Sequence, residues 1–194
     1  QLVRSELGIA EDAVVFITIG SFGARKGHDV LARAFGTLAG KHPDWRLLLV
    51  GPMSRDEGCH TEPDELAQMM APLQPYPAQV HRMGRVDDRD HIRRLLGASD
   101  VFVFPTRREG MPIAPMEAMA MGLPVIVSRI PDVTDVACVE QETGLFVPVG
   151  DADALARAME RLGSDAGLRR KFGEQARERI KPLHVDHPPA ALQQ

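Results

Sequence analysis

The chain has 194 residues, of which 44% are hydrophobic and 26% charged, a composition that can bury one core and favours a single α/β domain with a short tail. Its formal net charge of -4 argues against a nucleic-acid partner, because proteins that bind nucleic acid cluster lysines and arginines against the phosphates. The two cysteines are far apart and lack CxxC spacing, which excludes a disulfide framework. Such cysteine usage makes a reduced, cytoplasmic setting the expectation, and no apolar run is long enough to cross a bilayer, so we expect no direct membrane insertion.

Short apolar runs rich in β-branched residues alternate along the chain with segments of helical periodicity. This alternation predicts a parallel sheet of about six strands, and near-continuous hydrophobicity in the first and fourth runs requires helices on both faces, as in a doubly wound α/β fold. Residues 181–194 lack periodicity and are expected to form a disordered tail, leaving 1–180 as the domain. The predicted strands are 14–19, 46–50, 79–83, 101–104, 124–128 and 144–147, and the predicted helices are 29–39, 64–71, 91–96, 113–121, 151–162 and 166–180.

The loop after the first predicted strand, residues 20–27, combines glycines with two adjacent cations, and we call it the glycine loop. In an open parallel sheet, ligands bind at the carboxyl ends of the strands, where this loop lies. Its glycines permit close backbone approach, and Arg25 and Lys26 precede a predicted helix, an arrangement typical of an anion cradle. The loop matches neither the GxGxxG fingerprint nor the Walker P-loop, and a surface loop with two solvated cations stays an open alternative.

The loop after the fourth predicted strand, residues 105–112, carries an acid and leads into a helix, and we call it the glutamate loop. Glu109 lies at the carboxyl end of the strand, and Gly110 frees the backbone. Two prolines follow, which a helix tolerates only around its first turn, where amide donors are unused. Free amides between Gly110 and Ile113 are therefore expected to face the ligand crevice.

A second acid, Glu117, is predicted about one turn into the helix that follows. An ionised carboxylate accepts hydrogen bonds from vicinal hydroxyls, so a pair of carboxylates beside this crevice suggests sugar recognition. A structural acid, or one that complements the helix dipole, is an equal alternative for Glu117. Residues 87–90 contain a D-x-D pattern, but their place at the start of a predicted helix favours N-capping over a metal clamp, and no metal is expected.

Together the two loops resemble those of the group 1 glycosyltransferases, a large retaining family with two Rossmann-like domains that face one cleft. The segment EGMPIAPME, from Glu109 to Glu117, is similar to the family's E-x7-E element, and AMAMGLPV follows it. The segment FITIG and the later Arg25-Lys26-Gly27 resemble the family's "vGr…KG" stretch, MGRV at 83–86 its "flGrv" turn, and ETGLFVP at 142–148 its "getGllvp" stretch.

The resemblance covers residues 2–179 and implies the Rossmann-like C-terminal domain of that family, with 1–9 as the end of an interdomain segment. It implies a nucleotide diphosphate sugar, linked to UDP or GDP, as donor substrate, with no cofactor and transfer with retention. By the same resemblance, Arg25, Lys26 and Glu109 are catalytic, since they would hold the diphosphate and the transferred sugar. The residues implied to bind the donor are Gly20, Ser21, Met83, Gly84, Gly110, Met111, Pro112, Ile113 and Glu117.

Two departures from the family pattern bear on this donor site. Ser21 stands where the family has an arginine, and residues 130–135 replace a glycine-rich segment. The N-terminal acceptor domain is not part of the resemblance, so we expect the donor-binding domain of a longer glycosyltransferase, inactive in isolated form. Two alternatives stay open: a nucleotide-sugar-binding module without turnover, and a glycoside hydrolase built on the two carboxylates.

Overall fold

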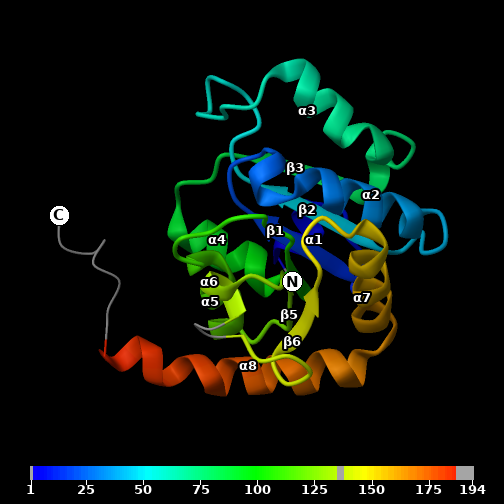
Figure 1. Ribbon diagram of the computed structural model, residues 1–194. Coiled ribbons are helices and arrows are strands. Elements are labelled where there is room, and N and C mark those ends of the chain that lie inside the picture. Colours follow the sequence, from blue (N-terminus) through cyan, green and yellow to red (C-terminus); the bar gives the residue numbers. More distant parts are fainter. Residues whose placement is uncertain (1, 135–137, 187–194) are drawn as a thin grey trace.

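The computed structural model describes residues 2–134 and 138–186, which form one layer of parallel strands between two layers of helices (Figure 1). In this part of the chain six strands pair in the order β3-β2-β1-β4-β5-β6, every pair parallel. Each strand begins and ends within one residue of its predicted range, which confirms the predicted sheet. The strands are β1 (Val15–Ile19), β2 (Arg46–Val50), β3 (Val80–Gly84), β4 (Val101–Phe104), β5 (Val125–Ser128) and β6 (Gly144–Val147).

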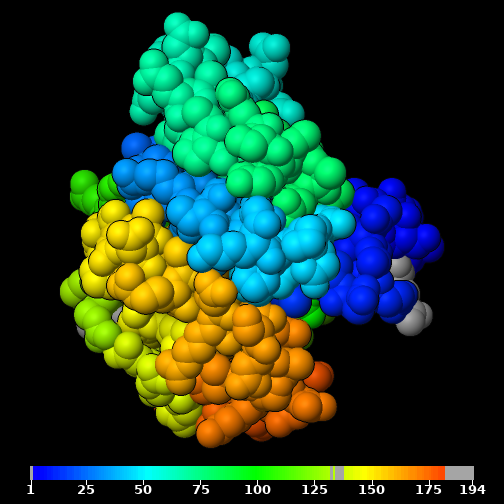
Figure 2. Space-filling view, turned by 90° about the vertical axis from the view of Figure 1, so that its right-hand side faces the viewer, coloured from blue at the N-terminus to red at the C-terminus, as the bar shows by residue number. Residues whose placement is uncertain are grey.

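Helices connect successive strands and cover both faces of the sheet, as the apolar patterns predicted. The segment around α3 stands out from the rest of the surface (Figure 2). The α-helices are α1 (Leu2–Glu6), α2 (His28–Ala39), α3 (Pro63–Met70), α4 (Arg89–Gly97), α5 (Ile113–Ala120), α6 (Pro131–Thr134), α7 (Ala152–Ser164) and α8 (Ala166–Asp186), with short 3-10 turns η1 (Ala24–Lys26), η2 (Ala71–Leu73) and η3 (Pro77–Gln79).

The sheet separates two hydrophobic cores, because successive side chains of a strand point to opposite faces. Phe16 of β1 belongs to the core beneath α2 and α7, where its ring centroid lies 5.1 Å from that of Trp45. Ile17, the next residue, belongs to the core beneath α4, α5 and α8. Both faces of β1 are therefore buried, which is why its sequence is continuously apolar.

Both ends of the described chain are helical. Residues 2–6, expected to be the end of an interdomain segment, form α1, and Arg4 anchors it by donating hydrogen bonds to the Ala98 carbonyl oxygen at 2.9 Å and to Asp100 at 2.7 Å. The helix α8 continues to Asp186, whereas the tail was expected to begin at residue 181. Extending a helix that is already nucleated costs little, so weak periodicity alone did not end it. The rest of the expected tail, 187–194, lies outside the described residues.

Candidate functional site

The glycine loop and the glutamate loop lie side by side where the strand order reverses. The strands β1 and β4 are neighbours, yet the chain continues from β1 to β2 on one side and from β4 to β5 on the other. The helix after the glycine loop, α2, packs on one face of the sheet, and the helix after the glutamate loop, α5, packs on the other. Such a divergence opens a crevice at the carboxyl edge of a parallel sheet, the usual ligand site of this architecture.

Gly27 sets how closely the two loops approach each other. Its φ of 73° lies in the left-handed region, and a Cβ atom built on it would stand 1.9 Å from the carbonyl oxygen of Pro105. Only glycine fits that contact. The backbones are also joined directly, because the Arg107 amide donates to the Arg25 carbonyl oxygen at 2.9 Å and the Thr106 hydroxyl donates to the same oxygen at 3.2 Å.

An ion pair between Lys26 and Glu109 lies at the centre of this loop contact. The two side chains are only 15% and 11% exposed. The Lys26 Nζ also lies 5.1 Å from the ring centroid of Phe104, within cation–π distance. Arg25 is exposed, and its guanidinium makes a long contact of 3.5 Å with the Arg108 carbonyl oxygen. Of the three residues that were expected to be catalytic, the structure thus joins Lys26 to Glu109 and places the Arg25 guanidinium against the residue before Glu109.

The amides at the start of α5 are more occupied than expected. The Gly110 amide donates to the carboxylate of Glu109 at 3.2 Å, and the Ile113 amide donates to the Met111 carbonyl oxygen at 2.9 Å. Pro112 occupies the N-cap position without a side-chain cap and has no amide hydrogen of its own. The expected run of free amides is therefore interrupted, because the loop satisfies part of its own hydrogen bonding. Gly110, Met111 and Ile113 are exposed to solvent at this edge.

Glu117 lies on α5, where its carboxylate accepts a hydrogen bond at 2.9 Å from Arg89 of α4. Its side chain is 36% exposed, so it is not a buried structural acid. Arg89 was not named from the sequence, because nothing in the pattern of α4 indicates which acid it meets. The neighbouring Asp88 accepts from the Asp90 amide at 2.9 Å, which confirms the predicted N-cap of this helix.

Met83 and Gly84 end β3, at the same edge of the sheet but two strands away from β1. The Gly84 carbonyl oxygen accepts from the Gly51 amide at 2.8 Å, and a Cβ atom on Gly84 would lie 2.8 Å from the Glu57 carboxylate. The backbone of Gly51 also lies close to that of Gly20, at the end of β1, since a Cβ atom on Gly51 would stand 2.1 Å from the Gly20 carbonyl oxygen. These close backbone contacts connect the ends of β1, β2 and β3 along one edge.

A second ion pair in the loop contact, between Arg107 and Asp29, was missed by the sequence reasoning. The guanidinium donates to both carboxylate oxygens, at 2.6 and 2.7 Å. Partial burial raises the pKa of Asp29, but the hydrogen bonds and charge of Arg107, together with the charge of Arg33 and a backbone hydrogen bond, outweigh it and hold that pKa below its usual value. The hydrogen bonds to Asp29 raise the pKa of Arg107 in turn. No local motif signals a pair separated by 78 residues.

His28 lies beneath the glycine loop and is only 1% exposed. Its ring stacks on Phe22 with centroids 3.9 Å apart, and Nδ1 lies 3.3 Å from the backbone nitrogen and oxygen of Gly23. Burial, the largest cause, lowers the pKa of His28 to about 4. The imidazole is therefore neutral near pH 7 and supports the loop by packing.

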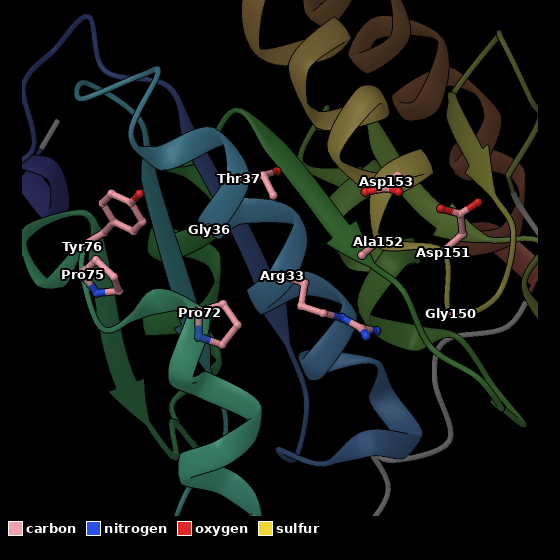
Figure 3. A pocket seen from close by; sticks show the side chains of 10 residues that line it. All are labelled: Arg33, Gly36, Thr37, Pro72, Pro75, Tyr76, Gly150, Asp151, Ala152 and Asp153. Carbon is pink, nitrogen blue, oxygen red and sulfur yellow. The ribbon is translucent and has the colours of Figure 1, made fainter.

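A groove of about 660 Å³ lies between α2, the connector that follows α3, and the start of α7 (Figure 3). None of its lining residues belongs to the glycine loop or the glutamate loop. Arg33 extends from α2 along this groove. Asp151, at its other side, already accepts from the Ala154 amide at 2.8 Å as the N-cap of α7. The groove is thus separate from the candidate site.

Residues 2–134 and 138–186 hold no group of three or more His, Cys, Asp or Glu side chains that could bind a metal ion. The same part of the chain contains no helix both long and apolar enough to span a membrane.

Comparison with known proteins identifies the relatives of this chain. The model of a family described as glycosyl transferases group 1 matches residues 1–179. LpsE of Rhizobium meliloti (strain 1021), a lipopolysaccharide core biosynthesis glycosyltransferase, is 30% identical over 177 residues, which are 91% of this chain and 47% of LpsE. The chain spans less than half the length of the curated relatives it matches.

Solved structures share the same fold. Sucrose-phosphate synthase from Thermosynechococcus elongatus superposes with a TM-score of 0.80 at 31% identity, over 93% of this chain and 43% of that one. The C-terminal domain of LpcC from Francisella tularensis superposes with a TM-score of 0.80 at 21% identity, over 95% of this chain and 92% of that one. The sheet described above is therefore the Rossmann-like sheet of these proteins.

Proposed function

This chain belongs to the group 1 glycosyl transferases, and we propose that it is the donor-binding domain of a retaining enzyme that transfers a sugar from a nucleotide diphosphate sugar. The observation that carries the proposal is the convergence of Arg25, Lys26 and Glu109 at the switch point of the sheet. A cation and a carboxylate from separate loops meet there, with a second, exposed cation beside them, at the edge where a nucleotide would enter.

The cations suit a diphosphate leaving group. Glycosyl transfer breaks the bond between the sugar and the diphosphate, so negative charge grows on the phosphate oxygens, and preorganised cations stabilise it. Lys26 is preorganised by its burial between Glu109 and Phe104. Arg25 is exposed beside it and can meet a phosphate directly.

Glu109 suits the transferred sugar. It pairs with Lys26 and accepts a hydrogen bond from the Gly110 amide, so two contacts from its own domain fix its position. A diphosphate that attracts Lys26 would leave carboxylate lone pairs free to accept sugar hydroxyls. On donor binding, the ion pair between Lys26 and Glu109 would thus be replaced by a contact of Lys26 with the diphosphate and a contact of Glu109 with the sugar.

Glu117 and the end of β3 complete the proposed donor site. The half-exposed carboxylate of Glu117 would accept the ribose hydroxyls, with Arg89 orienting it at 2.9 Å. Met83 and Gly84 would border the base at the same edge. Ser21 lies half-buried in the glycine loop, and its short side chain leaves phosphate binding there to Arg25 and Lys26.

The two carboxylates do not favour a glycoside hydrolase. Such an enzyme directs two carboxyl groups at the same glycosidic bond. Each acid here pairs with a cation of its own, Lys26 for Glu109 and Arg89 for Glu117, and cations at this edge suit a polyanionic donor better than a simple glycoside.

The remaining parts of the proposal concern the whole enzyme. Because the relatives are about twice as long, we place acceptor binding in a domain outside these 194 residues and expect the isolated chain to bind donor without transferring sugar. The donor is a substrate, and the proposal includes no cofactor. We place the protein in the cytoplasm, where nucleotide sugars would be available to it.

Calorimetric titration of the chain with UDP, GDP, ADP and their sugar conjugates tests the proposal. We expect selective binding of one nucleotide, lost in Lys26→Ala and weakened in Glu117→Ala. Lys41→Ala is the matched control, because Lys41 is an exposed cation on the connector between α2 and β2, at the opposite edge of the sheet. Folded protein that binds none of these ligands, or binding that Lys26→Ala leaves unchanged, would contradict the proposed donor site.

A further inference from the structure

The ion pair between Arg107 and Asp29 connects the glutamate loop to the helix that follows the glycine loop. No sequence motif indicates this connection. Asp29 lies in the first turn of α2, directly after the glycine loop, and Arg107 lies in the middle of the glutamate loop. The two nitrogen–oxygen distances, 2.6 and 2.7 Å, describe a bidentate pair, which fixes the orientation of the guanidinium as well as its position.

Arg107 also holds the backbone that carries the two proposed catalytic cations. Its guanidinium donates to the Ala24 carbonyl oxygen, and its own amide donates to the Arg25 carbonyl oxygen at 2.9 Å. Its neighbour Thr106 donates to the same Arg25 oxygen at 3.2 Å. One residue thus binds the carbonyl groups of two successive peptides, Ala24–Arg25 and Arg25–Lys26.

We propose that Arg107, held by Asp29, is the positioning residue that sets Lys26 and Glu109 in the geometry needed for the diphosphate and the sugar. This inference rests on the proposed function. Glu109 is only two residues from Arg107, and Lys26 is only two residues from Ala24, so a shift at Arg107 moves both members of the catalytic pair. Misplacement of about 1 Å can lower the efficiency of a site by about 100-fold.

Arg107 acts through other residues and does not bind phosphate itself. Both terminal nitrogens are engaged, one by Asp29 and Ala24 and the other by Asp29. Asp29 also neutralises this cation, so that it does not compete with Arg25 and Lys26 for an anion. The carboxylate lies in the first turn of α2, where the helix dipole favours a negative charge.

Arg33 supplies a matched control, because it meets the same carboxylate from within α2 itself. It lies one turn further along α2, 3.4 Å from the Asp29 oxygen, with its side chain 53% exposed. Figure 3 shows it extending along the separate groove. Removing Arg33 therefore takes one cation from Asp29 but leaves the link between the loops intact.

The test compares Arg107→Ala, Arg107→Lys and Asp29→Asn with Arg33→Ala in the full 194-residue chain. For each variant, titration with UDP, GDP and their glucose conjugates measures affinity, and amide hydrogen exchange measures opening of residues 20–27 and 105–112. We expect Arg107→Ala and Asp29→Asn to lower the affinity for the nucleotide that the parent chain binds by about 10- to 100-fold. Both variants should also speed amide hydrogen exchange in the two loops. Arg107→Lys should recover only part of the affinity, because an ammonium cannot form the bidentate pair.

Arg33→Ala should match the parent chain in both measurements. Parent-like affinity or unchanged loop exchange in Arg107→Ala would overturn the positioning role while leaving the proposed donor site standing. If the folded parent chain binds none of the nucleotides, the proposed function fails, and the positioning role fails with it. A loss of thermal stability alone, with parent-like affinity of the folded protein, would show that Arg107 serves the fold only.

Discussion

The two ion pairs that include a proposed donor-binding acid differ in their exposure to water. In the Lys26–Glu109 pair the side chains are 15% and 11% exposed, whereas in the Arg89–Glu117 pair they are 52% and 36% exposed. An exposed pair contributes little to stability, about 1 kcal/mol at most, while removing one partner of a buried pair leaves a charge that water cannot reach. The buried pair can therefore fix the relative positions of Lys26 and Glu109, whereas the carboxylate of the exposed pair, Glu117, stays accessible to a ligand.

The buried contact around Lys26 and Glu109 depends on Gly27, and Gly27→Ala is expected to have the largest effect. Its new methyl group would stand 1.9 Å from the Pro105 carbonyl oxygen, so the loops must separate. We expect the free energy of unfolding to fall by about 3 kcal/mol or more and nucleotide binding to be lost. Denaturant unfolding and titration with UDP and GDP measure the two effects.

Gly150→Ala is the control for that change. Gly150 has a comparable φ of 80°, but a Cβ atom there meets nothing within 4 Å. It should cost only the backbone strain, about 1 kcal/mol, without affecting nucleotide binding. Equal losses in the two variants would mean that the close approach to Pro105 has no energetic importance.

The packing beneath the glycine loop should make stability depend on pH through His28. Its folded pKa is about 4 and the ordinary value is 6.5, so between these values the unfolded chain binds the proton and the folded chain does not. The stabilisation that follows from this lowered pKa is fully present above pH 6.5. The free energy of unfolding then falls by about 3 kcal/mol as the pH decreases from 6.5 towards 4. Unfolding free energies of the parent chain and His28→Phe across this range should differ in slope; identical slopes would contradict the depressed pKa.

Glu109→Gln separates the two roles of the buried pair. Freed from a carboxylate, Lys26 should bind the nucleoside diphosphate at least as tightly as before, because its competing partner is gone. The additional affinity for the sugar conjugate should fall by about 10-fold, since a neutral amide accepts sugar hydroxyls less strongly than a carboxylate. Titration with UDP and UDP-glucose, or the GDP pair, gives both values, and an unchanged difference between them would refute the assignment of Glu109 to the sugar.

The exposed pair should give the smallest effect. Arg89→Ala is expected to change the free energy of unfolding by less than about 1 kcal/mol. Glu117→Gln should lower affinity for the ribonucleotide by about 10-fold or less while leaving the 2′-deoxynucleotide almost unaffected. A variant that discriminates between the two nucleotides as strongly as the parent chain would show that Glu117 does not read the ribose.

Much of the architecture could be predicted from local pattern. The strands β1 and β4 are continuously apolar because both faces are covered, and this identified them as central strands. The same patterns placed the glycine loop and the glutamate loop at the carboxyl edge. The fate of residues 2–6 and 181–186 was not predicted, because whether a weakly patterned end continues as helix depends on what it packs against and on the helix before it.

Sequence alone determined the sheet, the two loops and the residue types that meet at their crevice, because hydrophobic periodicity and glycine and proline chemistry act over a few neighbouring residues. Only the tertiary structure decided the partners. Lys26 meets Glu109 across 83 residues, Arg107 meets Asp29 across 78, and Arg89 meets Glu117 across 28. Such pairings depend on the order of the strands in the sheet and on how closely Gly27 lets the two loops approach. No short stretch of chain encodes the strand order or the separation of the loops.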